Sequence, residues 1–208
     1  MKKFVCFLLL TIIILSGILI TKINKTYAYD KEIYNEVYKE YEEILNDKPI
    51  NTQNRLKINI NSSTSNKPIR TFKNSTGSTY RTIAVIDIPK INLSYPIIND
   101  YSDENLNIAP TKFVGPAPNE VGNFVVVGHN NWNREFFSNL NKLEKGDTVT
   151  ITDYNKNSLN YQVTDMYEVN QNDFSCLDQN TNGNIELTLI TCIKYKKNKR
   201  LVVKCVSI

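Results

Sequence analysis

Two residues near the C-terminus have side chains suited to nucleophilic catalysis. Residues 186–192 (ELTLITC) and 200–203 (RLVV) both alternate in polarity, so we predict two strands joined by a short basic loop. If the strands pair as a hairpin, Cys192 and Arg200 lie close together at its loop end. A thiol beside a guanidinium is a candidate nucleophile next to an anion stabiliser. The alternative is a buried strand cysteine beside a solvated arginine, because free cysteine is among the most buried residue types.

The only histidine, His129, follows a second apolar run at residues 123–127. A Cys–His pair is the minimum equipment for acyl transfer, in which the thiolate attacks an amide carbon and the imidazolium protonates the leaving amine. Arg200 would then bind the oxyanion or hold the substrate backbone. A purely structural histidine is the alternative, and the spacing alone does not bring the two side chains together. A single histidine also argues against a histidine-built metal site.

Composition limits the function classes further. The chain has 208 residues and a net charge of +4 that is spread along the sequence, which does not favour nucleic-acid binding. Glycine-rich phosphate loops and zinc-type Cys/His spacing are absent from the sequence. Four cysteines, Cys6, Cys176, Cys192 and Cys205, show no regular spacing. A Cys176–Cys205 bridge is one option, and it would leave Cys192 as a free thiol.

The N-terminus carries an apolar run at residues 4–20, preceded by Lys2 and Lys3. We favour an uncleaved signal anchor within residues 1–28, with a signal peptide cut after Ala28 as the alternative. Both interpretations put the remaining chain outside the cytoplasmic membrane, and the anchor makes it a single-pass membrane protein.

Residues 29–50 are predicted to contain an amphipathic extracellular helix at 30–45, because apolar residues recur there at three- and four-residue spacing. We expect a stalk or a helix packed on the domain, and a segment that covers the substrate site is the alternative. Residues 51–80 are rich in Asn, Ser and Thr, which is typical of a polar linker.

Residues 81–208 form the fourth expected region, a folded domain of seven or eight short strands with little helix. One helical turn is expected near Asn105 and a short helix around residues 136–143. This pattern predicts an all-β barrel or sandwich. The predicted strands are 82–88, 93–98, 123–127, 148–153, 159–167, 186–192 and 200–206.

The same domain resembles the sortases. Residues 188–192 (TLITC), with Arg200 eight positions after the cysteine, are similar to the family's active-site signature. Residues 122–129 (GNFVVVGH) resemble the sortase histidine strand. Residues 88–91 (IPKI) and 146–147 (GD) match two further segments in the family's order. The resemblance implies an eight-stranded sortase-type β-barrel with short helices.

The resemblance also implies a cysteine transpeptidase, a thiol peptidase on the outer face of a Gram-positive membrane. It would cleave an LPxTG-like sorting signal of secreted surface proteins through a thioester on Cys192. An amine of a cell-wall precursor or a pilin lysine would take the acyl group. His129 would be the general acid and base, and Arg200 would steady the oxyanion or the signal peptide. Thr191 and Asn130 are then candidate substrate contacts.

No cofactor is expected, although Glu120 and Asp173 are candidate ligands of a calcium ion of the kind some sortases use. The basic segment 193–199 holds four lysines and has no large helical insertion, so the sortase subclass is not defined.

An L,D-transpeptidase would have its histidine and cysteine close together in a glycine-rich motif, and a papain-like hydrolase would place its cysteine first. A non-enzymatic, membrane-tethered β-domain that binds a wall component or partner protein is the alternative from another class.

Overall fold

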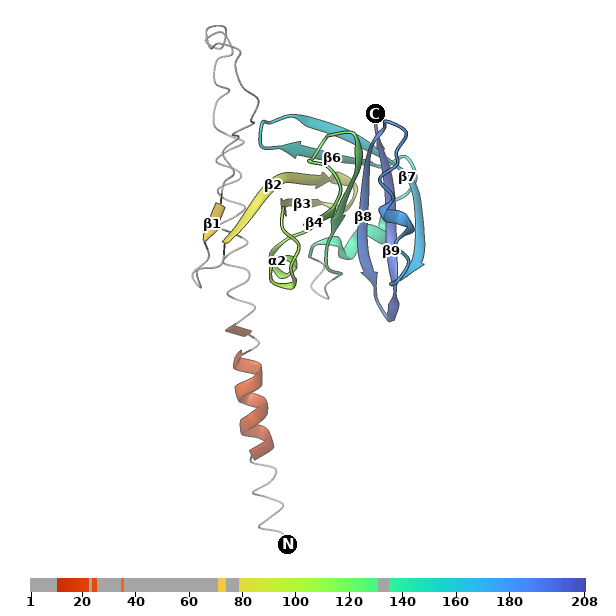
Figure 1. Cartoon of the computed structure of the whole chain (residues 1–208). Coiled ribbons are helices and arrows are strands. Elements are labelled where there is room, and N and C mark those ends of the chain that lie inside the picture. Colours follow the sequence, from red (N-terminus) through yellow and green to blue (C-terminus); the bar gives the residue numbers. More distant parts are fainter. Residues whose placement is uncertain (1–10, 23, 26–34, 36–70, 74–78, 131–134) are drawn as a thin grey trace, which may run out of the picture.

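The computed structural model describes residues 11–22, 24, 25, 35, 71–73, 79–130 and 135–208 (Figure 1). Residues 11–22 are helical, and within the described part of the chain no helix combines the length and apolar character needed to cross a membrane. The predicted anchor at 4–20 lies partly outside the described residues. The amphipathic helix at 30–45 and most of the linker also lie outside them, so these assignments stay predictions.

The described strands form one mixed sheet in the order β1-β2-β3-β4-β5-β8-β9-β7-β6. Strand β2 pairs with β6 as well as with β3, so β2 to β9 are joined in a ring of pairings. Most neighbours are antiparallel, but β3–β4 and β5–β8 are parallel. The strands are β1 Thr71–Lys73, β2 Thr79–Ile88, β3 Leu93–Ile98, β4 Thr111–Val114, β5 Gly122–Val127, β6 Thr148–Asp153, β7 Ser158–Asn170, β8 Ile185–Ile193 and β9 Lys196–Ser207.

Short helices fill the connections between strands. They are η2 Pro89–Ile91, α2 Asp103–Ile108, η3 Phe137–Lys142 and η4 Ser175–Leu177. The prediction of an all-β domain with short helices is therefore confirmed, including the helical turn near Asn105. Strand β4 was not predicted, because its four residues lie in a segment that reads as loop. Residues 71–73 and 79–80, which we assigned to the linker, are strand residues in the structure.

The main core lies on one face of the sheet and follows from alternation along the strands. Phe124 and Val126 of β5 and Leu187 and Leu189 of β8 are fully buried there. Each such side chain contributes about 1.5–3 kcal/mol relative to an exposed one. Because successive strand side chains point to opposite faces, the residues between them lie on the outer face.

A smaller cluster covers the outer face of β8 and β9. Val169, Cys176 and Val202 are buried there, with Leu177 and Ile190 packed against them. Segment 171–184, which includes η4, therefore lies against the outer face of the sheet. The suggested Cys176–Cys205 bridge is wrong: both thiols are free, and Cys205 belongs to the main core. Burial raises the pKa of the Cys205 thiol to about 12, so this thiol is unreactive.

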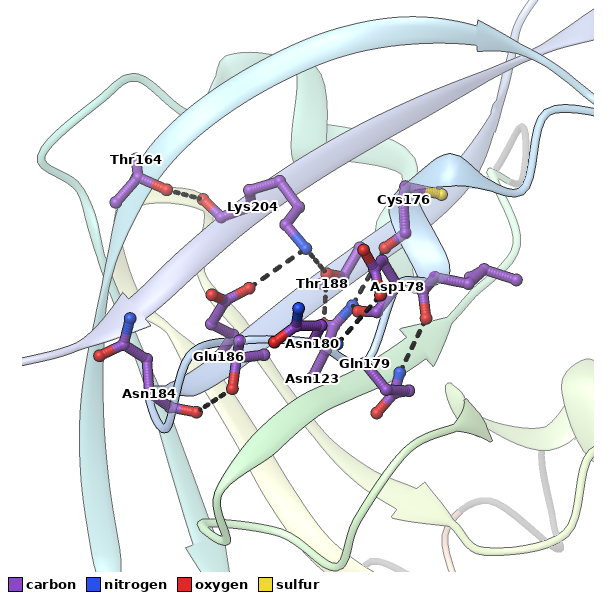
Figure 2. A network of polar contacts seen from close by, with 12 residues as sticks. Asn123, Thr164, Cys176, Asp178, Gln179, Asn180, Asn184, Glu186, Thr188 and Lys204 are labelled. Carbon is purple, nitrogen blue, oxygen red and sulfur yellow. Dashed lines mark hydrogen bonds and ion pairs between the residues drawn. The ribbon is translucent and has the colours of Figure 1, made fainter.

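A buried polar network fixes segment 171–184 to the sheet (Figure 2). The Asn123 side-chain amide of β5 donates to the carbonyl oxygens of Cys176 and Asp178, each at 3.0 Å. Its Oδ1 accepts from the Thr188 hydroxyl at 2.6 Å, and Lys204 Nζ donates to the same hydroxyl at 2.9 Å. Every polar atom of the Asn123 side chain is thus bonded, which is what burial of an amide requires. The network anchors the segment that lines the outer face beside β8.

Candidate active site

Parallel pairing of β5 with β8 brings His129 and Cys192 to the same edge of the sheet. The last registered pair is Val127 with Ile190, and the Gly128 amide continues the ladder by donating to the Ile190 carbonyl at 3.1 Å. His129 and Cys192 each follow two residues beyond that pair. The two residues therefore occupy equivalent positions on neighbouring segments, although 62 residues separate them along the chain.

Two side-chain bonds join the segments that carry these residues. The Thr191 hydroxyl donates to the Gly128 carbonyl at 2.7 Å, and Asn130 Nδ2 donates to the Cys192 carbonyl at 2.8 Å. Gly128 is required here because a Cβ would lie 2.7 Å from the ring of Phe137. Thr191 is buried with its hydroxyl engaged, so the role visible in the structure is to join the two strands.

Arg200 lies directly opposite Cys192 in the antiparallel β8–β9 pair. Directly opposite residues place their side chains on the same face, with Cβ atoms about 4.5–5.5 Å apart. The predicted hairpin is therefore confirmed. Arg200 Nη1 donates to the carbonyl oxygens of Lys197 and Lys199, at 3.2 and 3.0 Å. A guanidinium has five N–H donors, and both bonds use the same nitrogen.

The connection between the two strands is tighter than predicted. We expected a loop over residues 193–199, but β8 runs to Ile193 and β9 begins at Lys196. The turn consists of two residues, with Tyr195 in the left-handed region at φ 65°. The register shifts between the Cys192–Arg200 pair and the Ile193–Lys196 pair, which leaves three extra residues on β9. Their carbonyl groups are the ones that Arg200 binds, so the irregularity positions the guanidinium.

All three side chains belong to the outer face of the sheet. Cys192 is two positions from Ile190 and Arg200 is two positions from Val202, and both apolar residues belong to the outer cluster. His129 and Asn123 are an even number of residues apart, so their side chains lie on the same face of the extended chain. The Asn123 amide binds segment 171–184 on that face. Cys192 is exposed, whereas its two companions are half-buried. The arrangement leaves a reachable thiol flanked by an imidazole and a guanidinium.

Helix α2 fixes the imidazole. The Oδ1 atom of Asn107 lies 3.1 Å from Nε2 of His129. A carboxamide oxygen only accepts, so Nε2 carries the proton and Nδ1 keeps its lone pair. Burial lowers the pKa of His129, and the negative charge of Asp103 on the same helix partly opposes this effect. Sequence analysis missed Asn107 because it lies in a stretch read mostly as loop. The helical turn itself was predicted near Asn105, and the Ser102 cap, which accepts from Asn105 N, marks where it begins.

Cys192 lines a groove of about 480 Å³. Its lining includes residues of η3, among them Asn139 and Asn141, together with Asn130, Glu168 and Cys192. A larger pocket of about 550 Å³ lies elsewhere, among Arg81, Asn119, Asp153 and their neighbours. It contains none of the three proposed catalytic residues, whereas the smaller groove contains one of them, Cys192.

The two candidate calcium ligands are not brought together. Glu120 lines the larger pocket just before β5, at the end of the sheet where Gly122 pairs with Ile185. Asp173 follows β7 in a separate hollow beside Asn198, and its carboxylate accepts from the Ser175 amide at 3.0 Å. Among the residues that the structure describes, no group of three or more His, Cys, Asp or Glu side chains is placed to hold a metal ion.

Comparison with known proteins agrees with this geometry. Sortase A of Bacillus anthracis is 32% identical over 123 residues, which is 58% of this chain and 57% of that relative. The chain thus spans less than two thirds of the relative's length. A solved Clostridium perfringens sortase D5 transpeptidase is 32% identical, with a TM-score of 0.56, covering 61% of this chain and 79% of the other.

A second solved structure is Clostridium perfringens sortase C with the C-terminal cell wall sorting motif. It is 26% identical, with a TM-score of 0.53, and the match covers 60% of this chain and 69% of the other. The sequence pattern of the Sortase domain matches residues 86–208, which is more than half of the chain and contains His129, Cys192 and Arg200. The chain therefore belongs to the sortase family.

Proposed function

We propose that the protein is a cysteine transpeptidase that cleaves a C-terminal sorting signal of the LPxTG type and transfers the acyl group to an amine. The observation that carries the proposal is the meeting of Cys192, His129 and Arg200 at one edge of the sheet. The C. perfringens neighbours, a sortase D5 transpeptidase and a sortase C solved with a cell wall sorting motif, support the reaction and the substrate class.

In the first half-reaction, the Cys192 thiolate attacks the carbonyl carbon of the scissile peptide bond. Negative charge then develops on the carbonyl oxygen, and the remaining N–H donors of Arg200 stabilise it. The protonated imidazole of His129 gives its proton to the leaving amine as the C–N bond breaks. The product is a thioester between the substrate acyl group and Cys192. Loop segment 171–184, held by Asn123, forms a wall of the outer face on which the signal would lie.

In the second half-reaction, an amine attacks the thioester carbon and a C–N bond forms. The C–S bond breaks, sulfur leaves as the Cys192 thiolate, and His129 takes up one amine proton. The acceptor in this proposal is an amine of a cell-wall precursor or a pilin lysine. The N-terminal segment 1–28 would hold the domain at the outer face of a Gram-positive cell membrane. A thioester survives long enough for this step only when an amine is well placed relative to water.

The test uses the full-length chain and an LPxTG-like peptide. We expect peptide cleavage together with a mass adduct on Cys192, and we expect Cys192→Ala to remove both. Cys6→Ala is the matched control, because it changes a cysteine outside the matched domain and should keep activity. Full cleavage by Cys192→Ala would disprove the proposal. Ligand binding without any cleavage by the parent chain would instead favour the non-enzymatic β-domain.

A further inference from the structure

The tip of the β8–β9 hairpin, residues 193–199, projects beyond the strands on either side of it. Towards the tip, β8 pairs with β5 as far as Ile190, and β9 pairs with β7 as far as Lys199. The Gln171 amide then donates to the Asn198 carbonyl at 2.8 Å, which ends the ladder with β7. Residues 193–197 therefore extend past both neighbouring strands, at the lower end of the domain in Figure 1.

The hairpin tip is strongly basic. It contains no acidic residue and four lysines, Lys194, Lys196, Lys197 and Lys199. Glu168 pairs with Lys196 at 2.7 Å, and Asp173 shares a hollow with Asn198, so the lysines outnumber these two neighbouring acids. In the rest of residues 81–208, acidic residues outnumber basic ones. The positive charge of the domain is therefore concentrated at the hairpin tip.

An exposed aromatic ring lies among these lysines. Tyr195, one of the two turn residues, is 86% exposed and has φ 65°. The left-handed region disfavours a bulky side chain, and tight turns normally place Gly, Asn or Asp there. Neither the turn geometry nor burial in the core therefore explains a tyrosine at this position. A second exposed aromatic residue, Phe174, follows Asp173 in segment 171–184.

Lysines around an exposed tyrosine match the surface of an anionic membrane. Lipid headgroups attract each lysine, and tyrosine rings favour the region between headgroups and acyl chains. The apolar run at residues 4–20, which the proposed function places in a membrane, keeps the domain close to lipid. An acidic protein would match the charge as well, but a projecting tip of seven residues offers much less than the roughly 800 Å² that each partner buries in a specific protein interface.

We propose that the hairpin tip docks the domain on the anionic phospholipid headgroups of the membrane. Lys194, Lys197 and Lys199 supply the attraction, and the ring of Tyr195 enters the interface. Docking turns the sheet edge that carries Cys192 towards the lipid surface. The inference rests on the membrane location in the proposed function, and it adds a second contact that fixes the orientation of the domain.

The test places a fluorescent reporter at the hairpin tip of the full-length chain. Trp132→Phe removes the only tryptophan, and Tyr195→Trp introduces an interfacial ring at the turn. The chain is reconstituted into vesicles of phosphatidylglycerol or of phosphatidylcholine that contain brominated lipid, which quenches a ring at the membrane. We expect quenching in the anionic vesicles and none in the zwitterionic ones. Replacing Lys194, Lys197 and Lys199 by glutamine should lower the ratio of docked to undocked domain roughly a hundredfold, at about fivefold per lysine.

Two matched controls separate docking from general effects. Lys156→Trp, again with Trp132→Phe, puts the reporter at another exposed turn residue with φ 65°. Lys156 precedes the start of β7, whereas the hairpin tip lies beside its end, so this reporter should stay unquenched in both vesicles. Replacing Lys90, Lys145 and Lys156 by glutamine removes the same charge outside the tip, and it should leave the quenching of the Tyr195→Trp reporter unchanged.

Each other outcome is decisive. The proposal is overturned by equal quenching of the Tyr195→Trp reporter in both kinds of vesicle, by no quenching in either, or by equal quenching of both reporters. Unchanged quenching after replacement of the three tip lysines overturns it too. A chain that floats with neither kind of vesicle refutes the membrane anchor and the docking together. A chain that docks but does not cleave a sorting-signal peptide refutes the proposed reaction alone, and one that cleaves without docking refutes only this inference.

Discussion

The side-chain oxygen of Asn107 lies 3.1 Å from Nε2 of His129, and this contact sets which imidazole nitrogen is basic. With Nε2 donating to an oxygen that only accepts, Nδ1 is the nitrogen free to exchange protons. Asn107 does not need to touch the substrate to influence catalysis. It is a positioning residue that acts through the orientation and tautomer of His129.

We expect Asn107→Ala to lower kcat for sorting-signal cleavage, because the imidazole loses the bond that fixes its tautomer. We expect Asn107→Asp to move the pH profile of kcat to higher pH, because a carboxylate at this position raises the pKa of His129. Steady-state kinetics across pH measure both effects. Glu104→Gln, on the exposed side of the same helix, is the control for a general disturbance of α2. A parental pH profile in Asn107→Asp would show that the contact does not matter.

Arg200→Lys should reduce cleavage roughly 10²-fold, about the cost of losing one oxyanion donor. The Arg200 guanidinium binds two backbone carbonyls with one nitrogen and keeps its other N–H donors for the substrate. An ammonium lacks this planar arrangement of donors. The rate is measured with the same peptide, and Arg81→Lys serves as a matched control because Arg81 pairs with Asp100 outside the site. Parental activity of Arg200→Lys would rule out the role given to Arg200.

Asn123→Asp should lower the free energy of unfolding by about 1–3 kcal/mol or more, because a carboxylate cannot donate to the two carbonyls of segment 171–184. Denaturant titration measures the change, and the exposed Asn160→Asp should stay within about 0.5 kcal/mol of the parent. We also expect weaker binding of the signal peptide in Asn123→Asp. Equal stability of the two variants would mean that this network does not hold the segment.

The stability of the domain should fall as the pH drops through about 6.5. Burial lowers the pKa of His129 in the folded state, so the unfolded chain binds more protons in that range. The contribution of neutral His129 to the free energy of unfolding is therefore fully present above the pKa of the unfolded state and is lost on acidification. Because the chain has one histidine, His129→Gln should remove this pH dependence from thermal unfolding curves. A His129→Gln chain with the same pH dependence as the parent would contradict the assignment.

The strands and the hairpin that depend on short stretches of sequence were predicted correctly. Short strand-like runs predicted β3 and β6 to the residue. The hairpin that sets Cys192 opposite Arg200 was also predictable, because strand alternation and a short connection are local features. The two-residue turn was not, since its irregular register depends on guanidinium contacts with carbonyl groups on β9.

Contacts across the sheet were beyond the sequence alone. The β5–β8 pairing is parallel and joins distant segments, so no local signal shows that His129 and Cys192 meet. Strand β4 is short and is defined by its partners more than by its own residues. Asn107 and Asn123 gain their roles from tertiary neighbours, and an asparagine in a polar stretch gives no hint of either role.

The parallel pairing of β5 and β8 has a consequence for the life of the protein. The bond between the Thr191 hydroxyl and the Gly128 carbonyl spans 63 positions of sequence, so the thiol gains its imidazole only after nearly the whole domain has been made and has folded. A nascent or partly unfolded chain therefore carries an ordinary cysteine. In the proposed mechanism, reactivity and completion of the fold therefore arrive together, which protects the thiol from forming stray acyl bonds before the domain has folded.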